Sequence, residues 1–158
     1  MQKAADTTFA TNRKALHNYT IIESLEAGIM LAGTEIKSIR NRHVSLDDSF
    51  ARIDGDEVFL YNMHVNPYAQ GGRWNLEPTR PRKLLLHRQQ IERLRGKVSQ
   101  RGYALIPLRL YSKRGLAKID LAIGKGRQAY EKRDVIRERE VARDLRRMVR
   151  TKQKRLDD

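Results

Sequence analysis

The chain of 158 residues lacks cysteine, which excludes a disulfide framework and a thiolate metal site. It is also short of acids, since 19 Asp and Glu face 33 Lys and Arg and leave a net charge of +14 at pH 7. No apolar run approaches the ~18 residues needed to cross a bilayer, and the first residues lack a signal-peptide core. We therefore expect a soluble cytoplasmic protein whose partner is polyanionic.

The basic residues are concentrated in a C-terminal tail, residues 125–158, with 13 basic and seven acidic side chains. At helical spacing this tail has a narrow apolar stripe of Val141, Ala142, Leu145, Met148 and Val149. The opposite face carries Arg143, Arg146, Arg147 and Arg150. Such a helix is poorly suited to folding alone in water and well suited to folding on nucleic acid. A solvated helix packed on the body is the alternative, and a membrane site is weaker because the stripe lacks Trp.

The remaining sequence predicts residues 1–11 as disordered and residues 12–124 as one body rich in strands. Strand-like runs occupy residues 19–25, 28–33, 49–53, 57–62, 63–68, 103–111 and 116–124. The turns at Asp54-Gly55-Asp56 and at residues 112–115 are typical of hairpins. The pattern predicts a mainly β fold, a small antiparallel oligonucleotide-binding (OB-fold) barrel of about six strands with two or three short helices.

Two helices and one long loop complete the predicted body. Residues 34–40 form a short helix with Thr34 as its N-cap, and residues 83–96 form a longer helix that Gly96 ends. Residues 69–82 contain two glycines and two prolines and predict a long loop. Long loops in compact domains are often binding loops.

Two clusters in the body combine groups that RNA-binding proteins use. The segment before the first long strand supplies Asn12, Arg13, Lys14, His17 and Tyr19, which can hold phosphates and stack on splayed bases. The alternative for His17 and Tyr19 is an ordinary place at the mouth of the barrel. The second cluster contains Arg80, Arg82 and Lys83, for which we favour phosphate contact over a solubilising turn.

Catalysis has little support in the sequence. The four histidines show no metal-ligand spacing, and the acids near residues 47–57 are explained by a strand entry and a hairpin. We therefore expect no enzyme activity, no cofactor and no metal. A metal-dependent nuclease using those acids remains a rival hypothesis that incubation of labelled RNA with Mg²⁺ would test.

Six ordered blocks of sequence carry a specific resemblance to a known family. They are Asn12-Arg13-Lys14-Ala15 with His17 and Tyr19; Glu26-Ala27-Gly28-Ile29; Gly33-Thr34-Glu35-Ile36-Lys37-Ser38; Arg82-Lys83-Leu84-Leu85-Leu86; Ile106-Pro107-Leu108 with Tyr111; and Glu131-Lys132-Arg133. From about residue 12 to the tail, the chain resembles the SsrA-binding protein family, also called small protein B. Members are partners of transfer-messenger RNA (tmRNA) in bacterial ribosome rescue.

The resemblance implies a non-enzymatic adaptor that binds the tRNA-like domain of tmRNA and delivers it to stalled ribosomes (trans-translation). It places Tyr19, Glu26, Leu85 and His87 on the RNA-binding side, in addition to the basic residues named above. It implies that the tail is disordered when free and becomes helical in the empty mRNA channel. We expect a monomer whose partners are tmRNA and the ribosomal RNA of the decoding centre and mRNA channel, with no membrane contact.

The tail residues predicted to contact the ribosome fall in two groups. They are Lys125, Arg127, Tyr130, Glu131, Lys132 and Arg133 near the junction, a predicted hinge over residues 124–133, and Arg143, Arg147, Met148 and Val149 in the helix. Three positions depart from the family pattern: Glu131 replaces Asp, Tyr130 replaces a His of some members, and Arg42 replaces a turn glycine. We expect Asn41 to adopt the left-handed conformation of that turn instead.

Two questions stay open from the sequence. Glu26 is an acid in a basic field, and it can accept a hydrogen bond from a guanine or cytosine amino group or orient a cation such as Arg13. The chain could also be a ribosomal protein or an assembly factor that binds ribosomal RNA. A constitutive component would stay at unit stoichiometry through high-salt washing, whereas an adaptor would leave with its RNA.

Overall fold

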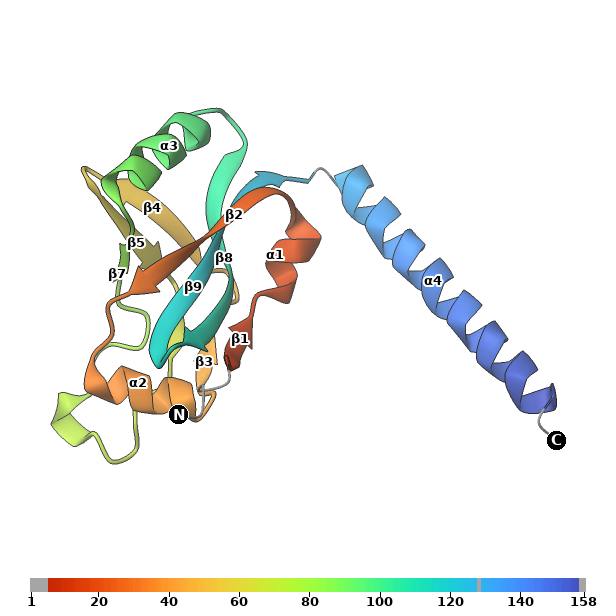
Figure 1. Ribbon diagram of the computed structural model, residues 1–158, viewed down its shortest axis with the longest axis horizontal. Helices are drawn as coiled ribbons and strands as arrows, with labels where there is room; N and C mark the ends of the chain where they lie inside the picture. Colours follow the sequence, from red (N-terminus) through yellow and green to blue (C-terminus); the bar gives the residue numbers. More distant parts are fainter. Residues whose placement is uncertain (1–5, 128, 157–158) are drawn as a thin grey trace. The chain divides into compact units, whose positions relative to one another are not determined.

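The structure is a computed structural model that describes residues 6–127 and 129–156. The chain divides into two compact units, Met1–Gly126 and Arg127–Asp158, and each is described by itself. The first unit is a β-barrel with three short α-helices, and the second contains a single long helix (Figure 1). The boundary therefore lies two residues beyond the predicted end of the body at residue 124.

Six antiparallel strands close into a ring in the order β8-β4-β5-β7-β2-β9, and β9 pairs back with β8. Their bounds are β2 Tyr19–Ile29, β4 Phe50–Asp54, β5 Glu57–Tyr61, β7 Arg82–Leu85, β8 Tyr103–Lys113 and β9 Leu116–Gly126. A closed ring has no unpaired central edge, which is how small all-β domains avoid edge-to-edge association. The prediction of a small OB-like barrel of about six strands is confirmed.

The strand β8 is long enough to hold several partners. One edge pairs with β9 along its whole length, while the other pairs with β4 at Leu105 and with β1 (Thr8–Thr11) farther along. The prediction that residues 1–11 are disordered is therefore wrong for residues 8–11, because the free edge of β8 supplies their backbone with partners. Residues 1–5 lie outside the described part of the chain. A separate two-stranded sheet joins β3 (Val44–Ser45) to β6 (His64–Val65).

The barrel interior follows from the alternation of side chains along each strand. On β5, Val58 and Leu60 are fully buried, whereas Phe59 and Tyr61 point to the opposite face and stay half-exposed. Ile119, Leu121 and Ile123 of β9 are likewise fully buried. Each such side chain contributes about 1.5–3 kcal/mol on burial, which supports a stable body without disulfides.

Tight hairpins connect the strands, as the sequence predicts at two positions. Asp54 pairs with Glu57 across a two-residue turn in which Gly55 has a φ of 61°. In the β8–β9 hairpin, Arg114 and Gly115 both have positive φ, which suits the right-handed strand twist. The prediction for the turn near residue 42 is wrong, because Arg42 itself has a φ of 61° and Asn41 an ordinary φ of −83°.

The helices differ most from the sequence predictions. The stretch predicted as a helix over residues 83–96 is divided: residues 82–85 form β7, and α3 runs over Arg88–Val98, past Gly96. Leu84 shares helical spacing with Ile91 and Leu94, but its backbone pairs with β2 and β5, so sheet pairing overrides the local pattern. A short unpredicted helix, α1 (Arg13–Asn18), precedes β2.

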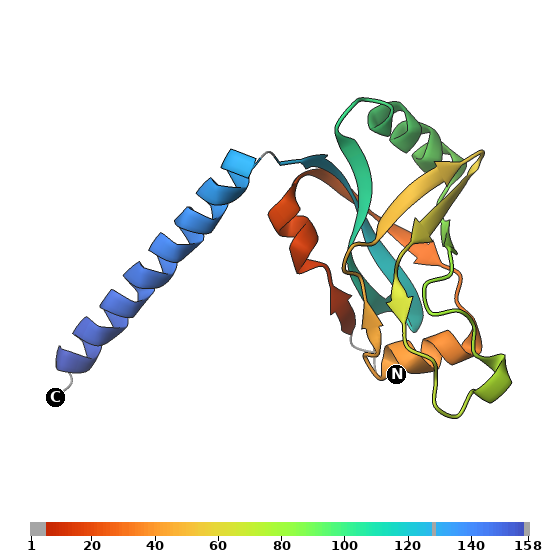
Figure 2. The same ribbon diagram turned by 180° about the vertical axis from the view of Figure 1, so that it is seen from behind.

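The second predicted helix is present as α2 (Gly33–Arg40), but its cap differs. Ala32, not Thr34, is the N-cap, and its N–H donates to the Glu35 carboxylate at 2.9 Å. The two longer body helices lie at opposite ends of the barrel, with α3 near the β4–β5 turn and α2 near the β8–β9 turn (Figures 1 and 2).

The tail forms one helix, α4 (Ala129–Leu156). It is longer than the predicted helical segment at residues 141–150. The predicted hinge over residues 124–133 contains the boundary between the two units, Gly126 and Arg127, and its role as a hinge stays a prediction. The stripe residues Val141, Leu145, Met148 and Val149 are all more than half exposed. None of the described helices combines the length and the apolar character that crossing a bilayer requires. That the tail is disordered when free stays a prediction.

Candidate nucleic-acid interface

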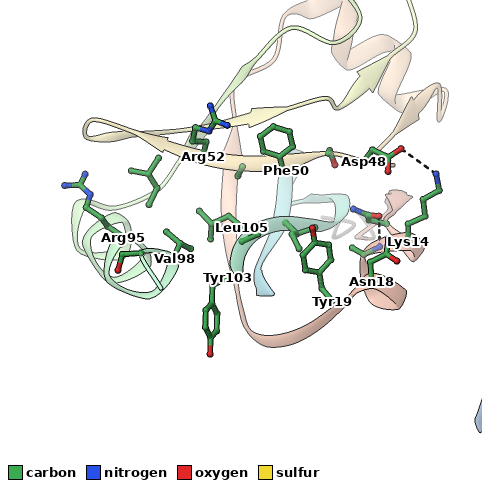
Figure 3. Close-up of a pocket in the computed structure, with 18 of the residues that line it drawn as sticks. Lys14, Asn18, Tyr19, Asp48, Phe50, Arg52, Arg95, Val98, Tyr103 and Leu105 are labelled. Carbon is green, nitrogen blue, oxygen red and sulfur yellow. Dashed lines mark hydrogen bonds and ion pairs between the residues drawn. The ribbon is translucent and has the colours of Figure 1, made fainter. Parts of the chain in front are cut away.

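Two grooves on the body gather the predicted RNA-binding residues. The first, which we call the α1–β4 groove, encloses about 890 Å³. Its lining includes residues from five elements: Lys14 and Asn18 of α1; Tyr19 of β2; Phe50 and Arg52 of β4; Arg95 of α3; and Tyr103 of β8. Figure 3 shows cations and aromatic rings from these elements around the groove. Cations and stackable rings along one groove are the combination with which proteins hold single-stranded nucleic acid.

Asn12 builds this groove instead of contacting a ligand. It is 2% exposed, its Oδ1 accepts from the Ala15 N–H at 3.1 Å, and its Nδ2 donates to the Pro107 carbonyl at 2.9 Å. Both ends of its amide are therefore in use, because the side chain caps α1 and ties it to β8. Asn12 is a positioning residue, and its predicted direct RNA contact does not fit this geometry.

The cap at Asn12 fixes where the neighbouring side chains lie. Arg13 and Lys14 are exposed on α1, and the Lys14 ammonium lies 3.6 Å from the Asp48 carboxylate. His17 and Tyr19 are half-buried at the end of α1 and the start of β2. Arg13, Lys14 and Tyr19 are thus available at this face, and the exposed ion pair at Lys14 is too weak to prevent phosphate contact.

The outer face of the β4–β5 hairpin carries aromatic residues that the sequence analysis missed. The rings of Phe50 and Tyr61 stack with centroids 5.5 Å apart and an interplanar angle of 17°. The Arg52 guanidinium lies over both rings, 5.8 Å and 5.6 Å from their centroids. Alternation with the buried Ala51 and Leu60 was the available signal, since the aromatic positions must face outward.

The second groove, which we call the β2–β7 groove, encloses about 810 Å³. Four predicted RNA-binding residues line it together: Glu26, Lys83, Leu85 and His87. They come from β2, from β7 and from the N-cap of α3, and pairing of Gly28 with Leu85 brings these segments into contact. The fold therefore joins residues that are 61 positions apart in the sequence, Glu26 and His87, at one surface.

Leu85 is 50% exposed in this groove, and the absence of a side chain at Gly28 makes room for it on the paired strand. A Cβ at Gly28 would lie only 3.1 Å from the Leu85 Cβ, closer than most real contacts of that kind. His87 is exposed, and its N–H donates to the Gln90 Oε1 at 2.9 Å. Lys83 donates to the Glu57 Oε1 at 2.8 Å in an exposed ion pair.

Glu26 is the centre of a charge network on the barrel wall. Its Oε2 accepts from the Tyr111 hydroxyl at 2.5 Å and from the Lys113 ammonium at 3.1 Å, and the Lys118 ammonium lies 4.0 Å from Oε1. The hydrogen bond from Tyr111, followed by that from Lys113, lowers the pKa of Glu26. The ion pairs of Glu26 are with Lys113 and Lys118 and not with the predicted Arg13, and a contact between Glu26 and a base stays a prediction.

Tyr111 is the reciprocal partner in this network. Burial, reinforced by the hydrogen bond to Glu26, raises the pKa of Tyr111 to about 12. The Arg109 guanidinium lies over its ring at 4.3 Å, and Arg109 is paired with Asp120 at 3.6 Å. The sequence analysis assigned no role to Arg109 or Lys113, which are exposed on β8 on either side of the buried Tyr111.

The prediction that Arg82 contacts phosphate is wrong. The same prediction for Arg80 has less support, because an ion pair already occupies its guanidinium. Arg82 is fully buried, donates to the Glu35 Oε2 at 2.7 Å, and donates to the Met63 carbonyl at 2.7 Å. Arg80 also pairs with Glu35. These two cations compensate a buried carboxylate, so of the basic cluster only Lys83 faces the groove.

All but one of the described tail residues that were predicted to contact the ribosome present their side chains to solvent. Lys125 is exposed at the end of β9, Arg127 is half-buried, and Arg133, Arg143, Arg147, Met148 and Val149 of α4 are exposed. The side chains of Tyr130, Glu131 and Lys132 lie outside the described ones. Over residues 6–127 and 129–156, no group of three His, Asp or Glu side chains is arranged to hold a metal ion.

Comparison with known proteins matches residues 9–151 to the family model described as SmpB protein. The SsrA-binding protein of Geobacillus kaustophilus is 51% identical over 154 residues, 98% of this chain and 99% of that protein. The SsrA-binding protein of Caldicellulosiruptor bescii is 54% identical over 140 residues, 89% of each chain. A solved structure described as "tmRNA-SmpB: a journey to the center of the bacterial ribosome" aligns with a TM-score of 0.64 and 48% identity, covering 77% of this chain and 86% of that one.

Proposed function

The chain belongs to the SmpB protein family, and we propose that it is an RNA-binding adaptor for tmRNA in ribosome rescue. It binds the tRNA-like domain of tmRNA and delivers it to stalled ribosomes, where the tail probes the empty mRNA channel. The similar solved structure, whose description names tmRNA, SmpB and the bacterial ribosome, supports these partners. The adaptor catalyses no reaction and acts as a monomer in the cytoplasm.

The observation that carries the proposal is the convergence of Glu26, Lys83, Leu85 and His87 at the β2–β7 groove. The resemblance to the family places Glu26, Leu85 and His87 on the RNA-binding side, and pairing between β2 and β7 brings their segments together. The groove offers an exposed apolar side chain, an imidazole and lysines at its edge. Such a surface suits a folded RNA loop, in which bases and phosphates are presented together.

Affinity in this mechanism comes mainly from phosphate neutralisation. Arg13 and Lys14 on α1, with Lys113 and Lys118 beside Glu26, supply cations on the body. Each phosphate contact releases counterions, so binding weakens steeply as salt rises. Tyr19 stacks on an exposed base at the α1–β4 groove.

Glu26 contributes by orientation. Its carboxylate holds the Tyr111 hydroxyl and two lysine ammonium groups in a fixed array, which reduces the entropy lost when phosphates bind. Removing it would leave Lys113 and Lys118 free to rotate. If Glu26 acted only through its negative charge, removing it would strengthen RNA binding. If Glu26 orients the two lysines, removing it weakens RNA binding.

The tail makes its contribution on the ribosome. Its helix carries exposed apolar residues opposite its arginines, and both faces can be covered only by a partner. When mRNA is absent, the vacant channel offers ribosomal RNA phosphates to the arginines and a surface to the stripe. The ordering cost is then met by ribosomal contacts, so the tail detects vacancy by folding.

The test is the affinity for free tmRNA of Glu26→Ala, with Glu23→Ala as a matched control. Glu23 lies on the same strand and pairs with Arg93 and Lys97, but it does not line the β2–β7 groove. We expect about a tenfold weaker complex for Glu26→Ala, equivalent to about 1.4 kcal/mol, and normal or slightly tighter binding for Glu23→Ala. Filter binding over a range of salt measures both.

Two results would contradict the proposal. If Glu26→Ala binds tmRNA as tightly as the unaltered protein at every salt concentration, Glu26 has no part in the interface. If the unaltered protein does not distinguish tmRNA from an unrelated RNA of equal length, the adaptor function itself fails.

A further inference from the structure

The loop between β6 and β7 presents an aromatic side chain that neither groove uses. Trp74 is the single tryptophan of the chain, and it is 71% exposed. It lies in the 3-10 turn Gly72–Trp74, and Leu76 beside it is 44% exposed. Exposed tryptophan is costly in water and is enriched where proteins contact partners. The exposure of Trp74 therefore needs a functional account.

Side-chain hydrogen bonds hold this loop in one shape. The Asn75 Oδ1 accepts from the Tyr68 N–H at 2.9 Å, and the Asn75 Nδ2 donates to the Tyr68 carbonyl at 2.8 Å. Gly71 allows this clasp, because a Cβ there would lie 2.7 Å from the Asn75 Oδ1. The Trp74 N–H donates to the Gly71 carbonyl at 3.0 Å. Trp74 is thus presented by an ordered turn.

The base of the loop is tied to the buried ion pair. The Pro78 carbonyl accepts from the Val65 N–H at 3.0 Å and from the Arg82 guanidinium at 3.0 Å. Arg82 in turn is held by Glu35. Both ends of the loop are therefore anchored to the barrel, which reduces the entropy that a partner must overcome on binding Trp74.

The charges around Trp74 favour an anionic partner. The Arg73 guanidinium lies 5.3 Å from the Trp74 ring centroid, and the Lys37 ammonium lies 5.3 Å from the Tyr68 ring centroid. The nearest acidic residue in the sequence is the exposed Glu77, three positions after Trp74, and none occurs between Asn66 and Leu76. An indole with an adjacent guanidinium can stack on a base while the cation meets the flanking phosphate.

We propose that Trp74 and Arg73 form a binding site for an unpaired RNA nucleobase, separate from both grooves. Arg73 engages the phosphate next to the stacked base. The proposal rests on the proposed function only in that the partner is RNA. The base can belong to tmRNA or to ribosomal RNA, because both offer unpaired bases with flanking phosphates.

The fluorescence of Trp74 tests the site directly, since no other tryptophan contributes in the free protein. Stacking on a base quenches indole emission. In the first arm the unaltered protein is titrated with tmRNA, and filter binding on the same samples measures the complex independently. In the second arm, protein with 5-hydroxytryptophan at position 74 is added to stalled ribosomes with tmRNA and excited selectively.

We expect saturable quenching in at least one arm, and the arm in which it first appears identifies the source of the base. Quenching in neither arm, while the complexes form, would overturn the proposal and leave the adaptor function intact. Absence of any complex with tmRNA would instead refute the adaptor function. The two failures are therefore distinguishable.

Substitutions and crosslinking supply the second measurement. Trp74→Ala should weaken the complex of the identified arm about tenfold, Trp74→Phe less, and the neighbouring control Leu76→Ala at most about twofold. A benzophenone amino acid at position 74 should crosslink to RNA in the same complex. Equal losses for Trp74→Ala and Leu76→Ala, or a crosslink to a ribosomal protein alone, would contradict a nucleobase site.

Discussion

The body and the tail of this chain use apolar residues in opposite ways. In the body, strands place alternate side chains inside a closed barrel, and residues such as Val58 and Ile119 are fully buried. In α4, the stripe residues Val141, Leu145, Met148 and Val149 are more than half exposed. The body carries its own core, whereas the apolar stripe of the tail is satisfied only by a partner.

The comparison shows how one basic chain can separate two tasks. A helix without its own core is only marginally stable in water, so its order can be coupled to a partner. A closed barrel holds its surface residues in place before binding. Substitutions in the body should therefore affect stability and tmRNA affinity, and substitutions in the tail should affect only events on the ribosome. The predictions below test this division, from the largest expected effect to the smallest.

The largest effect is expected at the buried ion pair of the body. Glu35→Ala should lower the free energy of unfolding by about 3–5 kcal/mol, because it leaves the fully buried Arg82 without its carboxylate. The control Glu57→Ala breaks the exposed pair with Lys83 and should cost less than about 1 kcal/mol. Urea unfolding, followed by the tyrosine fluorescence of the barrel or by NMR, measures the free energy of unfolding of both variants. Equal losses would refute the importance of the buried pair.

The stabilisation that this buried ion pair gives to the fold depends on pH. Burial raises the pKa of Glu35, but hydrogen bonds from Arg80, the Ala32 N–H and Arg82, with the charge of Arg82, lower it below 4.5 overall. A carboxyl with a depressed pKa stabilises the fold above the pKa of the unfolded state. That stabilisation is lost as the pH falls through the folded-state pKa. Glu35→Ala should therefore flatten the acid limb of the stability profile.

The next effect is expected in the tail. Replacing Met148 and Val149 with serine should reduce peptide tagging on stalled ribosomes about 100-fold, since burial of two such side chains contributes about 3 kcal/mol. Affinity for free tmRNA and the stability of the body should stay unchanged. The control replaces Arg146 and Arg150 on the opposite face and should reduce tagging less. A parallel loss of tmRNA affinity would break the division between body and tail.

A smaller effect concerns Tyr111 on the barrel wall. Its pKa of about 12, compared with 10.0 for an ordinary tyrosine, predicts a phenolate that forms late in an alkaline titration. Because the folded-state pKa is raised, this stabilisation is complete below pH 10 and is lost as the pH rises through about 12. The difference in phenolate absorbance between the unaltered protein and Tyr111→Phe isolates this group. A difference spectrum with its midpoint near 10 would contradict the contact with Glu26.

The smallest effect is expected at the turn after α2. Arg42→Gly should raise the free energy of unfolding by about 0.5 kcal/mol, since the φ of 61° strains an L-residue and the entropy cost of glycine offsets part of the gain. Asn41→Gly is the matched control, because φ there is −83° and glycine should destabilise. Thermal unfolding distinguishes them, and two losses of similar size would refute the strain at Arg42.

Much of the fold was predictable because strand alternation and turn chemistry are local. The hairpin at Asp54-Gly55-Asp56 and the β8–β9 hairpin follow from residues within a few positions of each other. The segment from Arg82 to Leu85 was not predictable in the same way. Its leucines fit a helix, and only pairing with β2 and β5 selects the strand.

The candidate site likewise contains residues that were predictable from the sequence and residues that were not. Residue type and resemblance selected Glu26, Lys83, Leu85 and His87, and the structure brings them to one groove. The burial of Asn12 and Arg82 was not predictable, because an amide or a guanidinium reads as a surface group until its partners are known. The stack of Phe50 and Tyr61 was missed although it is local, because the two-residue turn after Asp54 fixes the register that pairs these rings.

The sequence by itself determined the charge, the class of partner, the family, the hairpin turns and the amphipathic tail, because these depend on composition and on neighbours in the chain. Only the tertiary structure decided which cations remain available to a ligand. Arg82 is paired with Glu35 inside the body, and Lys113 and Lys118 are oriented by Glu26. The physical reason is that burial and ion pairing depend on distances between residues far apart in sequence, which are fixed only when the barrel closes.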